Sequence, residues 1–320
     1  MDLFSQGALG AACSQVVLNK YSKYYVWLVG GISGMAADLD VLIRSNTDPM
    51  LSLIYHRHFT HALSFIPLGG LLVALAFLPF KRFRQHWRIT LLAAIIGYAT
   101  HGLLDACTSY GTVLLWPFSE KRIAWDIISI IDPFFTFPLI LGLVWTLVFK
   151  SRKGVIAGLF VAGSLLIFNS WQHHRALTMM DTYARQQHLN LTKVRAFPAL
   201  GSSTHWRVAA YTNKHWLIAN VSTPLLQNGV VSVWGYFPAF HQADLPGYVY
   251  RTGQQFRDFS VFDWFTDGYL ITTSKQPLVL VDARYLSGPH PVFGLWGIEF
   301  NPNKFHVQRL RSISLEDTSS

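Results

Sequence analysis

Hydrophobic positions form long runs in the first half of this chain and short alternating stretches in the second half. Four runs are long and apolar enough to predict membrane-spanning helices, at about residues 62–80, 89–106, 133–149 and 154–171. Residues 25–35 form a shorter glycine-rich apolar segment. Residues 3–18 are apolar with many small side chains, which predicts a short helix packed inside the bundle.

The hydrophobic pattern changes after Trp171. Residues 172–188 predict a helix that leaves the membrane, and five later stretches predict strands, at 206–211, 216–221, 230–236, 278–281 and 293–300. We therefore expect an α-helical transmembrane bundle of about four to six membrane helices, followed by a small soluble α+β domain rich in strands. The expected domains are residues 1–174 and 175–320.

Composition supports a membrane protein. Hydrophobic residues make up 51% of the chain and charged residues only 13%, and the mean hydropathy is positive. The net charge is +9, but the basic residues fall in short clusters between apolar runs. That distribution favours membrane topology over nucleic-acid binding, so we do not expect a nucleic-acid partner.

The basic clusters predict the orientation of the bundle in the membrane. They contain Lys20 and Lys23, then Lys81, Arg82, Arg84 and Arg88, then Lys150, Arg152 and Lys153. Because basic loops stay in the cytoplasm, the loops on the opposite side should face outward. The last span then carries the chain outward, so the C-terminal domain is expected to be periplasmic or extracytoplasmic.

Histidine and aspartate residues gather at the predicted outer ends of the apolar runs. Asp38 and Asp40 follow the glycine-rich segment, and His56, His58 and His61 precede the next run. His101 and Asp105 are spaced i, i+4, which places them on one face of a helix. Ionisable groups beside membrane spans are expensive, and imidazole with carboxylate suits a hydrolytic metal site. Helix-end polar groups or a helix–helix ion pair are the alternatives.

The long loop before residue 133 carries further candidates. Lys121 and Arg122 would bind an anionic group or anchor lipid phosphates. Asp126 would form a salt bridge with Arg122 if the loop is helical there, and Asp132 precedes Pro133, where it would cap the next span.

At these residues the chain resembles a bacterial family of inner-membrane proteins regarded as metal-dependent hydrolases, and in particular its long two-domain subgroup. The matching stretches are Met1-Asp2-Leu3-Phe4-Ser5-Gln6, Ala37-Asp38-Leu39-Asp40, His56-Arg57-His58-Phe59-Thr60-His61-Ala62 and His101-Gly102-Leu103-Leu104-Asp105. The resemblance covers about residues 1–170 closely. It implies a membrane-embedded metal-dependent hydrolase.

The chain departs from the family pattern at four positions. Gln6 stands where many relatives have histidine, Ala37 replaces proline, His58 replaces glycine and Ala62 replaces serine. The family is also distantly similar to zinc-dependent phospholipases C and single-strand nucleases, which implies phosphoester hydrolysis by fold-level analogy.

The resulting hypothesis is a membrane-bound hydrolase that acts on a phosphoester, lipid or lipid-linked, at the outer face of the membrane. The expected metal is zinc, with manganese or iron as alternatives, and the expected partners are membrane lipid and the phosphoester substrate. Its ligands would be Asp38, Asp40, His56, His61, His101 and Asp105, with catalytic roles for Asp40, Arg57 and Arg122. A membrane-anchored binding protein is the alternative. A transporter fits less well because the polar residues cluster at one end of the spans.

Overall fold

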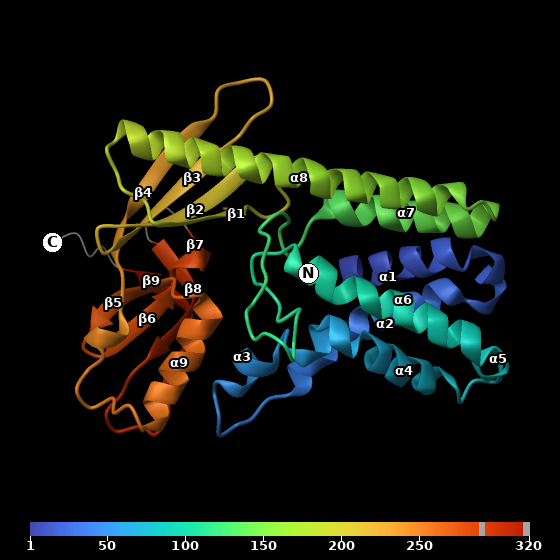
Figure 1. Ribbon diagram of the computed structural model, residues 1–320, viewed down its shortest axis with the longest axis horizontal. Coiled ribbons are helices and arrows are strands. Elements are labelled where there is room, and N and C mark those ends of the chain that lie inside the picture. The colour runs from blue at the N-terminus through green and yellow to red at the C-terminus, as the bar shows by residue number, and fades with distance from the viewer. Residues whose placement is uncertain (288–291, 316–320) are drawn as a thin grey trace. The chain divides into compact units, whose positions relative to one another are not determined.

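The computed structural model describes residues 1–287 and 292–315, and the chain separates into two units. The first unit contains Met1–Leu42, Tyr55–His174 and Pro198–Thr204. The second contains Ile43–Ile54, Arg175–Phe197 and the described part of His205–Ser320. Most of the first unit is helical, and the second is built around two β-sheets (Figure 1).

The first unit is a bundle of helices. Its helices are α1 (Leu3–Val17), α2 (Val26–Ala36), α4 (Ile66–Phe77), α5 (Lys81–Gln85), α6 (Trp87–Ala106), α7 (Pro133–Phe149) and the first part of α8 (Lys153–Gln186). Short 3₁₀ helices lie between them: η1 (Asn19–Tyr24), η2 (Ala37–Leu42), η3 (Phe59–His61) and η4 (Leu63–Phe65). Helix α6 packs against α1, α2 and α4, which places it inside the bundle.

Two helices in the described part of the chain are long and apolar enough to cross a membrane, α6 and α8. A third span exists if the bent pair 51–61 and 63–77 is one span, and the helices of this pair meet at 61°. Helix α7 is apolar but one turn shorter than α6. The predicted helical bundle is confirmed, but the described residues offer two or three candidate spans instead of the expected four to six, because α4 is shorter than its apolar run suggested and α7 has only 17 residues. Helices α1 and α2 form where apolar helices were predicted.

Glycines allow α1, α2 and α6 to approach closely. A Cβ atom added at Gly97 would lie 2.1 Å from the carbonyl oxygen of Gly30, and one added at Gly10 would lie 2.4 Å from the same atom. Ser14 and Ser33 donate hydrogen bonds to α6 carbonyl oxygens. Such contacts between small residues are typical of helices packed within membranes, where backbone proximity replaces hydrophobic driving force.

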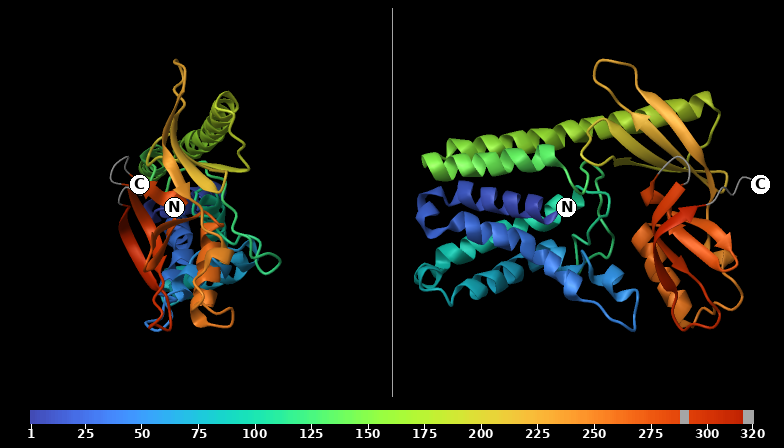
Figure 2. Two further views of the ribbon diagram at one scale, coloured as in Figure 1. Left: turned by 90° about the vertical axis from the view of Figure 1, so that its left-hand side faces the viewer. Right: turned by 180° about the vertical axis from the view of Figure 1, so that it is seen from behind.

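The second unit contains two antiparallel sheets. The first sheet has the order β1 (Lys193–Pro198), β2 (His205–Thr212), β3 (His215–Ser222) and β4 (Val230–Pro238). The second has the order β5 (Leu270–Lys275), β6 (Leu278–Asp282), β8 (Val292–Glu299) and β7 (Leu286–Ser287), and β9 (Gln308–Leu315) also pairs with β8. Helix α9 (Gln254–Thr266) lies beside the second sheet, and α3 (Leu51–Tyr55) begins in the same unit (Figure 2).

Successive side chains of a strand point to opposite faces of the sheet. The first sheet therefore contributes to two core clusters, one on each face. On β2, Trp206, Val208 and Ala210 pack with Ala176 and Met180 of α8. Ala209 faces the opposite side and packs with Tyr269 and with residues of the second sheet such as Ile271 and Val281. The first sheet is therefore covered by α8 on one face and by the second sheet on the other.

The predicted strands are confirmed, but the alternation did not reveal every element. Strands β1, β5, β7 and β9 and helix α9 were not predicted. Residues 172–188 were expected to begin the second domain, and the structure joins most of them to the preceding span, because α8 continues without a break from Lys153 to Gln186.

Candidate metal centre

Four side chains from three separate stretches of chain converge in the first unit. Asp38 comes from η2, His61 from η3, and His101 and Asp105 from α6. His61, His101 and Asp105 are buried, and Asp38 is partly buried. We call these four residues the His/Asp quartet. Each of them was a predicted metal ligand.

The quartet has the dimensions of a tetrahedral site. His61 Nε2 lies 3.0 Å from His101 Nε2. Each of these nitrogens is 3.5 Å from Asp38 Oδ1, and they are 3.2 and 3.6 Å from Asp105 Oδ2. Zinc bonds of roughly 2.0–2.1 Å in tetrahedral geometry place ligand atoms about 3.3–3.4 Å apart. The donor set therefore fits one divalent ion.

The donor atoms also show unmet bonding capacity. Asp105 Oδ2 is buried and accepts no hydrogen bond from the described residues, although Arg57 Nε lies 3.1 Å away. The two histidines direct their Nε2 atoms toward each other, an arrangement that a shared cation stabilises. Buried polar atoms are rarely left without partners, so these atoms are consistent with a cation among them.

Neighbouring groups fix the orientation of both imidazoles. His101 Nδ1 is 2.6 Å from the carbonyl oxygen of Gly34, which accepts the Nδ1 proton and leaves Nε2 as the lone-pair atom. His61 Nδ1 lies 3.3 Å from Asp40 Oδ2 and 3.0 Å from Thr60 Oγ1. Metal-binding histidines commonly have such a partner at the second ring nitrogen.

Asp40 is the polar centre of the segment around His61. Its Oδ2 accepts hydrogen bonds from the Arg57 backbone N–H and from Thr60 Oγ1, both at 2.9 Å. Its Oδ1 lies 2.8 Å from His56 Nδ1. Asp40 and His56 also form a smaller cluster with Asp38 that could hold an ion. The closest contacts of Asp40 are hydrogen bonds, so the geometry favours an orienting role for it.

The carboxyl groups of η2 are held ionised. Burial alone would raise the pKa of Asp38, but the close contacts with the His101 and His61 imidazoles outweigh burial and lower that pKa well below its usual value. Burial of Asp40 is likewise outweighed by its hydrogen bonds with His56 and His61, which lower its pKa. Both groups are therefore anionic at neutral pH, as a cation site requires.

The two predicted catalytic arginines occupy different surroundings. Arg57 is 5% exposed and donates from Nη1 to Thr108 Oγ1 at 3.0 Å, beside Asp105. Arg122 donates to backbone carbonyl oxygens, including that of Gly111 at 2.8 Å. Arg57 thus places a cation next to the quartet, whereas the bonds of Arg122 hold the loop.

Other predicted residues fall outside the quartet. His58 lies among aromatic rings, with ring centroids 5.9 Å from Tyr55 and 6.3 Å from Trp116. His58 and His61 are spaced i, i+3 and would share a face on an α-helix, but the chain forms a turn and a short 3₁₀ helix there. The helix that would pair Arg122 with Asp126 is also absent from 122–126. Asp132 caps α7 through the N–H groups of Phe134 and Phe135, as the sequence suggested.

The sequence assigned no role to several groups that support the quartet. Gln6 Nε2 donates to Asp105 Oδ1 at 2.9 Å, and the amino group of Met1 pairs with the same oxygen. Thr60 stands inside the His56–His61 motif, which could have marked it. Gly34 acts through its carbonyl oxygen, for which the sequence holds no chemical signal.

Comparison with known proteins places this arrangement in a family. A model of the YdjM inner membrane protein family matches residues 1–176, a range that contains the whole quartet. The chain belongs to this family. With its apolar helices, the match identifies an inner-membrane protein.

One curated relative is an uncharacterized protein, YfhP, of Bacillus subtilis (strain 168). It is 28% identical over 133 residues, which are 40% of this chain and 39% of the relative. The match therefore spans well under half the length of either protein. No solved structure matches the chain.

Proposed function

We propose that this inner-membrane protein is a metal-dependent hydrolase whose ion is held by Asp38, His61, His101 and Asp105. The observation that carries the proposal is the spacing of four donor atoms, 3.0–3.6 Å for the pairs that involve a histidine. Zinc fits this donor set, and manganese or iron would accept the same ligand types. A bound ion of this kind supplies Lewis-acid activation of water.

The protein's own residues supply the rest of the site. Asp40 and Gly34 orient the imidazoles through Nδ1. Arg57, beside Asp105, places a positive charge where an anionic group would be held during reaction. Because Arg57 is a guanidinium suited to oxyanions, a phosphoester is the substrate class that we favour. The distant similarity to zinc-dependent phospholipases C predicted from the sequence would imply the same substrate class, and it stays a prediction because no solved structure matches the chain.

A lipid or lipid-linked phosphoester suits the surroundings of the quartet. Leu39, Val41 and Leu42 belong to the same 3₁₀ helix as Asp38 and expose 63%, 56% and 69% of their surfaces. Exposed apolar side chains beside a polar site favour an amphiphilic phosphoester over a water-soluble one that has no apolar part. We place the reaction at the outer face of the membrane, with the C-terminal domain outside, on the charge distribution of the loops.

The decisive experiment compares metal content by elemental mass spectrometry in detergent-purified protein. We expect about one equivalent of metal in the wild type and its loss in a His101→Gln, Asp105→Asn variant. His58→Gln is the matched control, because His58 lies three positions before His61 but outside the quartet, and it should retain the metal. Full metal content in the double variant would contradict the site.

Activity is tested on the same preparations. Hydrolysis of a phosphate-ester lipid in mixed micelles should require the metal and should fall at least tenfold in Arg57→Gln. A metal-loaded wild type that cleaves no phosphoester would retain the metal site and contradict the hydrolase assignment.

A further inference from the structure

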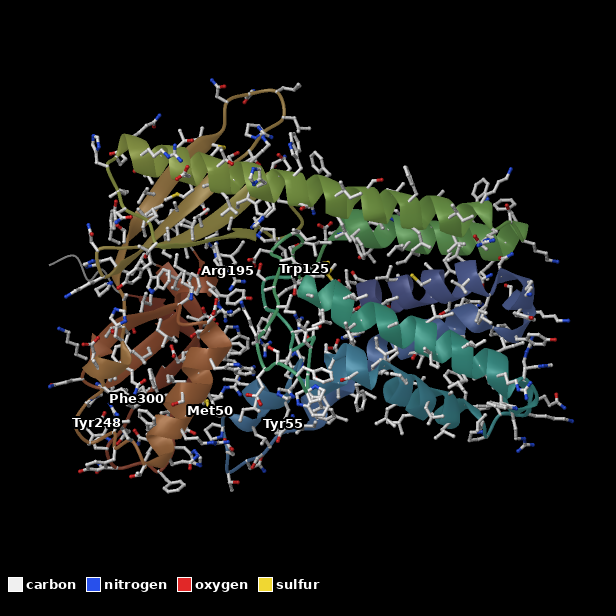
Figure 3. All side chains as sticks on the ribbon, in the orientation of Figure 1. Met50, Tyr55, Trp125, Arg195, Tyr248 and Phe300 are labelled. Carbon is white, nitrogen blue, oxygen red and sulfur yellow. The ribbon has the colours of Figure 1, made fainter. Side chains whose placement is uncertain are left out.

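The segment that joins two parts of the metal centre belongs to the other unit of the protein. Residues Ile43–Ile54, which we call the strap, connect Asp40 with His56 along the chain, yet the strap groups with the C-terminal strands and α9. Met50, which belongs to the strap and is labelled in Figure 3, is fully buried. The strap is therefore an integral part of the second unit.

Two arginines of the second unit hold the strap. Arg309 of β9 donates from Nη1 to Ser52 Oγ at 2.7 Å and to the Pro49 carbonyl oxygen at 3.1 Å. Arg257 of α9 forms an ion pair with Asp48 at 2.8 Å. Within the strap, Asp48 also accepts a hydrogen bond from the Met50 backbone N–H at 2.9 Å. The two arginines thus contact two successive positions, Asp48 and Pro49, and Ser52.

The network behind Arg257 is closed by hydrogen bonds. Asp258 is fully buried and accepts from His306 Nδ1 at 2.8 Å and from the Val307 N–H at 3.1 Å. Asp48, Asp258 and His306 together have the spacing of a possible cation site. However, the Arg257 guanidinium lies between the two carboxylates, 2.8 and 3.4 Å from their oxygens, so the cation is already supplied. The cluster is an anchor for the strap.

The residues that flank the strap on either side meet at the metal centre. Asp40 and His56 are in direct contact at 2.8 Å, and the Arg57 N–H and Thr60 Oγ1 also bond to Asp40. Bringing the ends of a loose loop together costs conformational entropy. A strap that is already held in the second unit removes part of that cost and limits the positions that Asp40 and His61 adopt.

We propose that the C-terminal unit pre-organises the metal centre by holding the strap, with Arg257 and Arg309 as positioning residues. This inference rests on the proposed metal site and gives the C-terminal unit a role in it. Disturbing the arginines should weaken metal binding although neither residue belongs to the quartet.

The test measures metal affinity of the full-length protein in detergent by competition with a chelator of known affinity. We expect Arg257→Ala with Arg309→Ala to lower the affinity by roughly tenfold, the lower end of the range for residues that support ligands. Arg311→Ala is the matched control, because Arg311 lies on the same strand but over the Trp296 ring, and its affinity should equal that of the wild type. A variant with Arg257→Ala and Arg309→Lys should lose less metal affinity than the double alanine variant, because the lysine ammonium group can also donate hydrogen bonds to Ser52 and Pro49.

Hydrogen exchange of the strap distinguishes the outcomes. Faster exchange in residues 43–54 with weaker metal binding supports the inference. Faster exchange with unchanged affinity overturns it, and so does unchanged exchange in the double variant. If the double variant fails to fold, Asp48→Asn replaces it. This substitution weakens the ion pair with Arg257 without changing the size of the side chain, and the same results for exchange and metal affinity support or overturn the inference. A wild type that binds no metal would contradict the proposed function, whereas a metal-bound wild type with unaffected variants contradicts only this inference.

Discussion

At the residue scale, a side chain is a metal ligand or a supporting group according to which of its atoms faces the His/Asp quartet. For histidine the atom is a ring nitrogen, and for aspartate it is a carboxylate oxygen. Asp38 and Asp40 are two positions apart and look equivalent in the sequence. In the structure Asp38 faces both imidazole Nε2 atoms, whereas Asp40 faces the Nδ1 side of His61. Two similar carboxylates therefore take different roles because of a turn of the backbone between them.

This difference predicts the behaviour of Asp40→Asn. The amide loses the charge that favours the His61 orientation but keeps the size of the side chain, so metal affinity should fall about 10–100-fold without complete loss. A chelator competition titration measures the change. Asp132→Asn, which alters a helix cap elsewhere in the unit, should leave the affinity unchanged. Complete loss of metal from Asp40→Asn would instead identify Asp40 as a ligand.

At the element scale, helix positions around the centre depend on close backbone packing. Gly30 of α2 lies against both Gly10 of α1 and Gly97 of α6, and Gly34, one turn further along α2, accepts the hydrogen bond from His101. The same helix contact therefore fixes both the bundle and one imidazole.

Gly97→Ala should destabilise this contact. Its Cβ would meet the Gly30 carbonyl oxygen at 2.1 Å, and overpacking of this kind costs about 1–3 kcal/mol. Thermal unfolding in detergent measures the loss. Gly163→Ala is the matched control, since no atom lies within 4 Å of its added Cβ and the helix propensity of alanine should raise stability slightly. Equal melting temperatures for the two variants would contradict the packing argument.

Helix α9 gives a prediction with a pH dependence. Burial of Asp263 raises its pKa despite the nearby Lys193. A carboxyl group with a raised folded-state pKa costs stability once it ionises, so Asp263→Asn should raise the melting temperature at pH 7. The gain should shrink as pH falls and both states of the wild type become protonated. A gain of equal size at low pH would exclude ionisation as its cause.

At the scale of the whole molecule, one helix links the membrane part with the strand-rich part. Helix α8 runs unbroken from an apolar N-terminal part to residues that cover the first sheet. The strap makes a second chain connection between the units. Residues Pro198–Thr204, which belong to the first unit, make a third connection, so the chain passes between the two units repeatedly along the sequence.

The proposed orientation places the C-terminal unit outside the cytoplasm. In a background without Cys13 and Cys107, Leu226→Cys should react with a membrane-impermeant thiol reagent in spheroplasts, because Leu226 is 98% exposed. Arg84→Cys, in the basic helix α5, should react only after lysis. The reverse pattern would invert the proposed topology and place the metal centre on the cytoplasmic side.

The sequence by itself determined the elements and the chemical types at the site. Long apolar runs require helices in a bilayer, and period-two alternation requires strands, so α6, α7 and β2 could be predicted from local pattern. His101 and Asp105 were paired by helix geometry alone. Helix α9 and strand β9 were not predicted because their apolar residues show no clear local period. The positions of these residues depend on the core that the assembled sheets form.

Tertiary structure decided which candidates meet. It assembled Asp38 and His61 with the α6 pair, turned Asp40 and His56 into neighbours of that quartet, directed Arg122 to backbone carbonyls, and assigned the strap to the second unit. A sequence records which groups are present, but the distances between atoms from separate segments depend on how helices pack and where the chain turns. Metal binding depends on those distances to within a few tenths of an ångström, and the order of residues does not contain them.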